Sequence, residues 1–324
     1  MELKGWENLK KENVEIYTQY LNSCKSSNYE TWGTTYFTYI NNFKLFLIWF
    51  EENYKNRYLL SKDILIEMPQ IIEEYRNHCR SIGNSKRTLM NKTTSISSFF
   101  LWCVRRNKCK FHPFDKKLDR LKFSEKDKIR KNYFLNTEQI LTVRLFMKFQ
   151  SKKYDIQDRI LWELFLDSAC RITAIQNLKL EQLRLEEGYF EGVKEKEGYI
   201  VHAFFFEKCK ILLKEWIKFR EDNGIDSEWI FITKYGSIFK QMSQGTIRNR
   251  VKKMGFILDI QDLYPHSLRK TSINLINNLA GLGVASSYAN HTSSNVTSKH
   301  YLQKTNPMEV RNNIIQLRKK LGIF

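Results

Sequence analysis

Apolar side chains in the first 110 residues recur at alternating spacings of four and three, which is the period of an α-helix with one buried face. The stretch TTYFTYINNFKLFLIWF follows this spacing with Tyr36, Ile40, Phe43, Leu47 and Phe50. Such a stripe must be buried against neighbouring elements, and further helices are predicted in the same region. The pattern therefore predicts a helical bundle over residues 1–110.

Two further helices are predicted in the same region. Ser85 can cap a helix whose stripe continues through Ile96, Phe99, Phe100, Cys103 and Val104. The segment ILIEMPQIIEEYRNHC predicts another helix, with its start near Pro69 because proline is favoured in the first turn.

The charge of the chain indicates a polyanionic partner. The 324 residues carry a formal net charge of +19, and this length is sufficient for two domains. Nucleic acid fits better than a membrane, because there is no run of about 18 apolar residues and the start MELKGWENLKKENVEIY has no apolar signal core. We expect a cytoplasmic, nucleoid-associated protein that binds DNA and no membrane.

The cysteines are scattered and are most simply buried apolar residues of a reduced protein. A zinc site near Cys103, Cys109 and His112, with His78 and Cys79 close in sequence, is the alternative. No CxxC or HxxxH pair supports it, so we expect no metal.

A basic segment separates the bundle from a second domain. From Arg105 to Lys131 there are 12 Lys or Arg residues against 4 Asp or Glu, and Pro113 breaks the preceding helix. We predict a linker over residues 111–133, either a solvated connector or a strap along a phosphate backbone. The second domain then begins with NYFLNTEQI, in which Asn136 and Gln139 can form a capping box.

Arg171 lies at a predicted helix junction. The pattern of IQDRILWELFLDSACRITAIQNLKLEQL is helical up to Leu166, and a short helix restarts at Thr173 with Ile175 and Leu178 inward. An arginine in such a junction either ties down backbone carbonyls or binds phosphate.

Short β-prone runs follow, which predict a three-stranded antiparallel sheet between Gln182 and Phe206 with Lys194 and Lys196 at its second turn. Further along, LLKEWIKFRED is helical, WIFIT is a short strand, and SQGTIRNRVKKMG is a basic helix capped by Ser243 or Thr246. The predicted fold class is mainly α with a small antiparallel β-sheet in the second domain.

The segment YPHSLRKT places His266 and Arg269 three residues apart, on one face of a predicted helix. Both can hold the same small anion.

Four motifs, ACRITAIQNL, VKEKEGYIV, HSLR and ANHTSSNVTSKHYLQ, stand in an order that resembles the tyrosine recombinase (phage integrase) family. The resemblance is close over about residues 130 to 305 and covers the rest as a pattern of helices. It implies a two-domain, C-shaped clamp around double-stranded DNA. In this clamp residues 1–110 are a core-binding, SAM-like domain, and residues 134–324 are a catalytic domain with a C-terminal exchange helix.

The resemblance also implies a catalytic set, which consists of Arg171, Lys194, His266, Arg269, His291 and Tyr301. Two guanidiniums can hold the oxygens of a scissile phosphate, and Tyr301 would attack it to give a 3′-phosphotyrosyl intermediate. His266 is our candidate to accept the tyrosine proton, and Lys194 to protonate the leaving 5′ oxygen. Because the phosphotyrosyl bond conserves the energy of the broken ester, no metal or nucleotide cofactor is expected.

The chain departs from the family pattern at several positions. Ala174 stands where the family commonly has an acidic residue three after its first arginine, so the partner of Arg171 comes from elsewhere or is absent. Asn290 replaces a glycine, and the step from His291 to Tyr301 is one residue longer than usual. Lys196 could take the place of Lys194 if the turn is tighter.

We expect base readout and phosphate contacts from basic residues on predicted helices, and the alternative is that these are solvated charges. They are Lys86, Arg87, Lys92, Arg105, Arg106, Arg248 and Arg250.

The tail places Val310, Ile314, Leu317 and Leu321 on one helical face. This face either folds back on its own domain or, as the resemblance implies, docks into a neighbouring protomer to give a homotetramer on two sites, with a dimer per site. Because the helical pattern begins close to Met1, we expect no arm-binding domain. Integration, excision, resolution and transposition all remain open, and the rival functions are an inert DNA-binding clamp and a relaxing topoisomerase.

Overall fold

The computed structural model describes residues 6, 8–27, 36–55, 57–124, 127, 133–195, 199–289 and 298. The chain forms two compact units, Met1–Lys131 and Asn132–Phe324. None of the described helices is long and apolar enough to cross a membrane.

The first unit is built from helices, as predicted. They are α1 (Lys11–Ser27), α2 (Phe37–Tyr54), α3 (Lys62–Ser81) and α4 (Lys86–Arg105). Aromatic rings fill the core between them: the Tyr17 and Phe43 rings stack at a centroid separation of 3.8 Å, and Phe99 meets Phe43 edge-on at 4.8 Å. The predicted stripe of α2 is therefore its buried face, with Phe43, Leu47 and Phe50 in the core.

The predicted start of α3 was wrong. The helix begins after Ser61, which has extended backbone angles, and Pro69 lies inside it. A proline within a helix removes one backbone hydrogen bond, here the one to the carbonyl of Leu65. Ile64, Leu65 and Met68, all fully or largely buried, are the residues that place this first part of the helix in the core.

The predicted linker begins too early. Phe114 is buried in the core of the first unit, and Leu118 and Leu121 pack against that core. Lys86 on α4 also donates to Lys122 O and to Asp127 Oδ2, both at 3.0 Å. Residues 111–122 thus belong to the first unit.

The second unit surrounds one buried helix, α6 (Ile156–Ser168). This helix contacts α5 (Thr137–Phe149), α7 (Ile172–Gln176), α8 (Glu207–Asp222), α9 (Gln244–Gly255) and α10 (Pro265–Tyr288). Its side chains Leu161, Trp162 and Phe165 are fully buried. A helix that neighbours enclose on most sides is apolar around most of its circumference. The α6 sequence, IQDRILWELFLDS, has this character.

Three caps predicted from the sequence are present. Asn136 and Gln139 form a reciprocal capping box at the start of α5. Ser85 accepts a hydrogen bond from the Thr88 N–H, and Ser243 accepts one from the Thr246 N–H. Each cap satisfies a backbone donor that would otherwise lack a partner in the first turn.

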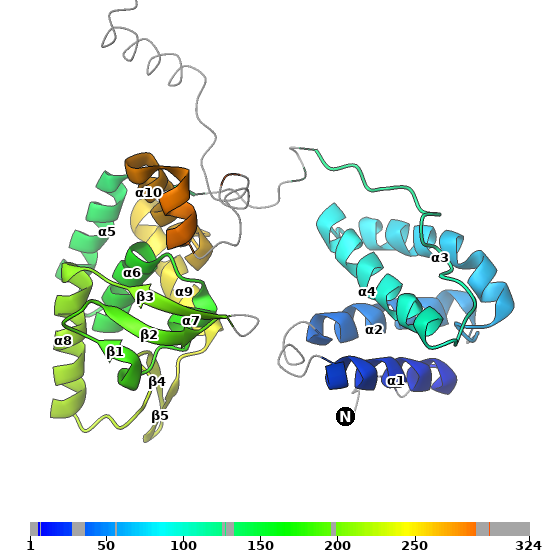
Figure 1. Ribbon diagram of the computed structural model, residues 1–324, viewed down its shortest axis with the longest axis horizontal. Helices are drawn as coiled ribbons and strands as arrows, with labels where there is room; N and C mark the ends of the chain where they lie inside the picture. The colour runs from blue at the N-terminus through cyan, green and yellow to red at the C-terminus, as the bar shows by residue number, and fades with distance from the viewer. Residues whose placement is uncertain are drawn as a thin grey trace, which may run out of the picture. The chain divides into compact units, whose positions relative to one another are not determined.

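The predicted three-stranded antiparallel sheet is also present. A short 3₁₀ turn (Leu180–Gln182) leads into β1 (Leu183–Arg184), which pairs with β2 (Tyr189–Lys194), and β2 pairs with β3 (Ile200–Phe204). Helix α7 contacts both β2 and β3 (Figure 1). A second hairpin, β4 (Ile232–Tyr235) with β5 (Ile238–Gln241), extends the predicted single strand WIFIT by a strand that we missed.

A β-bulge shapes the end of β2. Between the pairs Phe190↔Ala203 and Val193↔Val201, β2 has one residue more than β3, and Gly192 has a left-handed φ of 63°. An extra residue moves all later side chains to the opposite face of the strand. Val193 and Glu195 are consequently buried, and Lys194 between them is exposed.

Candidate active site

Arg171 lies at the junction of α6 and α7. Ala169 ends α6 with a left-handed φ of 49°, and Arg171 is the extended residue immediately before α7. Its side chain retains 37% of its accessible surface, so the guanidinium can be reached from solvent. The predicted helix junction is therefore confirmed as the place of this arginine.

Glu195 is the acidic partner of Arg171. The carboxylate, 3% exposed, forms an ion pair with Arg171 Nη1 through Oε2 and accepts the Arg171 backbone N–H through Oε1 at 3.3 Å. The Glu195 backbone N–H donates to Tyr199 O at 2.7 Å, which fixes the residue where β2 ends. We did not identify Glu195 from the sequence, where its only signal is its place beside Lys194.

Lys194 is the last residue of β2 and is exposed. It pairs with Ile200 in β3, and its carbonyl accepts a hydrogen bond from Asn177 Nδ2 at 3.2 Å. Because Asn177 follows the last residue of α7, the hairpin contacts both ends of that short helix. Lys196 lies outside the described residues.

His266 and Arg269 lie in the first turns of α10. His266 is exposed, and its ring stacks beside Tyr264 at a centroid separation of 6.4 Å. Arg269 is buried, at 1% exposure, and donates through Nη1 to Ala169 O and through Nη2 to Ala289 O, the latter at 2.8 Å. Arg269 thus ties the end of α6, two residues before Arg171, to the end of α10.

Cys170 lies among these charged groups. The thiol is buried, and this burial raises its pKa to about 11. The charge of Glu195 raises this pKa further, while Arg269 and Arg171 lower it. His291 and Tyr301, the remaining predicted catalytic residues, lie outside the described residues.

The residues predicted to contact DNA fall into two groups. Arg87, Arg105, Arg106 and Arg248 are exposed, and Lys86 is half-buried by its contact with Asp127. The predicted DNA contact of Lys92 is wrong, because this residue is buried. Its Nζ lies 3.4 Å from Cys79 Sγ and 5.7 Å from the centroid of the Tyr75 ring.

Arg250 also has a structural role that the sequence did not reveal. Its Nη1 donates to Asp155 Oδ1 and Asp158 Oδ1, both at 2.8 Å, and Asp158 is almost fully buried. These contacts hold α9 against the start of α6. A guanidinium engaged with two carboxylates has little charge left for a phosphate, so we no longer assign Arg250 to DNA.

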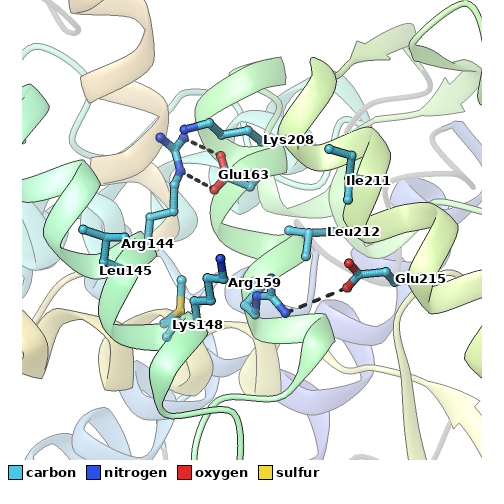
Figure 2. A pocket seen from close by; sticks show the side chains of 10 residues that line it. Arg144, Leu145, Lys148, Arg159, Glu163, Lys208, Ile211, Leu212 and Glu215 are labelled. Atoms are coloured by element: carbon cyan, nitrogen blue, oxygen red, sulfur yellow. Dashed lines mark hydrogen bonds and ion pairs between the residues drawn. The ribbon is translucent and has the colours of Figure 1, made fainter.

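A pocket of about 360 Å³ lies elsewhere, between α5, α6 and α8. Figure 2 shows that Arg144 points at Glu163, to which it donates two hydrogen bonds of 2.6 Å, and that Arg159 points at Glu215. The residues that line this pocket do not include Arg171, Lys194, His266 or Arg269. This pocket is therefore separate from these predicted catalytic residues, and its two arginines form ion pairs within the pocket.

No cluster of three or more His, Cys, Asp or Glu side chains suited to a metal ion occurs within the described ranges. The predicted zinc alternative has no such group there. His112 instead contacts Ser97: its Nε2 lies 3.0 Å from Ser97 Oγ, and its Nδ1 accepts the Asp115 N–H at 2.9 Å.

Comparison with known proteins identifies the family from the sequence, and solved structures share the fold. The sequence profile of the phage integrase family matches residues 134–307. Tyrosine recombinase XerC of Thermodesulfovibrio yellowstonii is 27% identical over 226 residues, which are 66% of this chain and 71% of that protein.

Two solved structures have a similar fold. The Tn1549 transposon integrase in complex with circular intermediate DNA has a TM-score of 0.64 at 16% identity and covers 93% of this chain and 98% of its own. The XerH site-specific recombinase bound to a palindromic difH substrate has a TM-score of 0.63 at 19% identity. The match covers 88% of this chain and 79% of the XerH chain. The profile match spans more than half of the chain, and the chain therefore belongs to the phage integrase family of tyrosine recombinases, enzymes that break and rejoin DNA.

Proposed function

We propose that this recombinase cleaves one strand of its site with Tyr301 and holds the 3′ phosphate on that residue until a 5′ hydroxyl rejoins it. The Tyr301 oxygen attacks phosphorus and gives its proton to His266. The bond from phosphorus to the 5′ oxygen breaks, and Lys194 supplies the proton that this oxygen needs. Rejoining is the same step in reverse, so no external energy source enters.

The observation that carries this proposal is the convergence of charged groups on α7. Arg171 stands at the start of the helix, Lys194 is anchored to its far end through Asn177, and Arg269 holds the loop that leads into it. A phosphate beside the exposed Arg171 side chain would therefore lie beside the hairpin that presents Lys194.

His266 fits the part of proton acceptor because it is exposed at the start of α10 while Arg269, one turn later, is buried. A general base must reach its substrate group, and an exposed imidazole can. Contact of Arg269 with the phosphate would accompany its bonds to Ala169 O and Ala289 O or replace one of them. Arg269 then both supports the Arg171 loop and contributes positive charge.

The assembly we propose is a dimer on each double-stranded site and a homotetramer on two sites. The substrate of the XerH complex is palindromic, and a two-fold site is matched by two copies of a protein. We assign contacts with DNA phosphates to the exposed Arg87, Arg105, Arg106 and Arg248. DNA as the substrate fits a protein of the cytoplasm, and the proposed chemistry needs neither metal nor nucleotide.

The test uses a site whose scissile phosphate carries sulfur in place of the bridging 5′ oxygen. A thiolate leaves without a proton, so Lys194→Ala should cleave this substrate at nearly the wild-type rate while it fails on normal DNA. Arg171→Ala should fail on both substrates, since a charge-assisted bond to a transition-state oxygen contributes about 3 kcal/mol. Failure of Lys194→Ala on the sulfur substrate would remove Lys194 as the acid, and rescue of Lys196→Ala would assign that role to Lys196. Normal cleavage by Arg171→Ala would refute the proposed site.

A further inference from the structure

Ala174, three residues after Arg171 on the short helix α7, offers the arginine no acidic partner. Ala174 is fully buried and its side chain has no polar atom. An unsupported arginine side chain samples many rotamers, and this lowers its effectiveness in a reaction that needs a fixed charge. Some other group must therefore orient Arg171 if it is to act on a phosphate.

We propose that Glu195 is the positioning residue for Arg171, and that the hairpin of β2 and β3 thereby controls both the phosphate-binding arginine and the proton donor. This inference rests on the proposed roles of Arg171 and Lys194. Glu195 does not touch the DNA in this proposal. It acts through the arginine.

The geometry of the contact supports this role. Glu195 holds Arg171 at two points, the backbone N–H and the guanidinium Nη1. The first fixes the main chain at the start of α7, and the second fixes the direction of the side chain. The carboxylate is 3% exposed against 37% for the arginine, so the arginine keeps an open side while its partner is shielded from water. A carboxylate shielded from water attracts a guanidinium more strongly than a carboxylate at the surface does.

The bulge at Gly192 gives the two neighbouring hairpin residues their opposite directions. Without the extra residue, alternation from the buried Phe190 would turn position 194 inward and position 195 outward. With it, Glu195 faces Arg171 and Lys194 faces outward. The pairing of Lys194 with Ile200 and the bond from Glu195 N–H to Tyr199 O hold this arrangement at the strand end.

These contacts couple the position of Lys194 to that of Arg171. A displacement of the end of β2 that moves Lys194 also moves the adjacent Glu195 and releases Arg171. The proton donor and the phosphate-binding arginine are therefore in place together or displaced together.

The experiment compares Glu195→Gln with Glu191→Gln. Glu191 is a matched control because it lies on the same strand and pairs with an arginine outside the site, Arg184 Nη2, at 2.6 Å. The full chain at saturating concentration is mixed with its nicked site, and the single-turnover rate constant and the final fraction cleaved are both measured. Gel shift and thermal unfolding accompany each variant.

We expect Glu195→Gln to cleave roughly 10- to 100-fold more slowly, as a misplaced catalytic group does, with a normal final fraction and normal DNA affinity. Glu195→Asp, which keeps the charge on a shorter side chain, should recover part of the rate, and it carries the test if Glu195→Gln does not fold. Glu191→Gln should behave as the wild type.

Two results would overturn the inference. One is a wild-type rate constant for Glu195→Gln. The other is a wild-type rate constant with a reduced final fraction, which marks a purely structural role because only the amount of folded enzyme has changed. Arg171→Ala in the same assay separates the two proposals: if it cleaves normally, the proposed function fails whatever Glu195 does.

Discussion

Gly192→Ala tests whether the β2 bulge controls catalysis. Gly192 has a φ of 63°, and a Cβ built on it meets no atom within 4 Å. The substitution therefore introduces backbone strain without a steric clash. For a residue with a Cβ, the left-handed conformation costs roughly 1–2 kcal/mol.

The expected fall in the cleavage rate follows from the marginal stability of the end of a two-stranded hairpin. Few other interactions there would compensate for an unfavourable backbone conformation. A penalty of about 1–2 kcal/mol lowers the ratio of the bulged to the regular arrangement by a factor of roughly 5 to 30. Only that arrangement turns Glu195 toward Arg171 and Lys194 outward. We therefore expect the cleavage rate constant of Gly192→Ala to fall by roughly 5- to 30-fold.

Gly236→Ala is the matched control. Gly236 has a φ of 60°, meets nothing within 4 Å, and lies in the turn between β4 and β5. Both variants should lose the same amount of stability in thermal unfolding, but only Gly192→Ala should cleave slowly under single-turnover conditions. Equal cleavage rates for the two variants would refute the reasoning from the bulge.

Three further predictions address other parts of the second unit. Arg269→Lys should destabilise the protein by roughly 2–4 kcal/mol in urea unfolding, because lysine lacks the fixed fork of two nitrogens, Nη1 and Nη2, that reaches Ala169 O and Ala289 O separately; an unchanged midpoint would contradict the contacts. Burial raises the pKa of Asp167 from 3.8 to about 6, so this carboxyl destabilises the fold progressively as pH rises through that window. Asp167→Asn should thus be more stable than the wild type at pH 7, by at most about 3 kcal/mol, and the gain should vanish near pH 4; a gain that is the same at both pH values would refute the assignment. A chain ending at Asn306 should bind one labelled site in a gel shift but fail to pair two sites, whereas normal pairing would remove the proposed role of the tail.

The fold could be predicted from the sequence where the signal is local. Asn136 with Gln139, and Ser243 before α9, satisfy the backbone of their own first turn, so a few neighbouring residues determine these helix starts. The start of α3 is predicted wrongly because a proline is most common in the first turn of a helix, whereas Pro69 lies inside this one. The buried Ile64 and Leu65 before it outweigh the lost hydrogen bond.

Lys92 could have been predicted as buried. It stands three residues after Leu89 and four before Ile96, both in the core, and thus lies on the apolar face of α4. The positive charge of lysine favours a DNA contact, but the helical period shows that the side chain lies on the buried face of α4.

The pairing of Arg171 with Glu195 could not be predicted in the same way. The two residues are 24 positions apart, and their contact depends on the register of β2 against β3. A glycine inside a strand signals a possible bulge, but it does not give the pair of residues between which the register shifts. Contacts between distant segments require the three-dimensional structure.

The covalent step is the central claim, and the most direct measurement of it is the trapping of the protein on DNA. The full chain is mixed with its site carrying a nick near the scissile phosphate, which lets the leaving strand diffuse away and prevents rejoining. We predict an SDS-resistant adduct in which peptide mapping finds the 3′ phosphate on Tyr301, and we predict that Tyr301→Phe binds the same DNA without forming it. An adduct that persists in Tyr301→Phe, or that maps to another residue, would contradict the account.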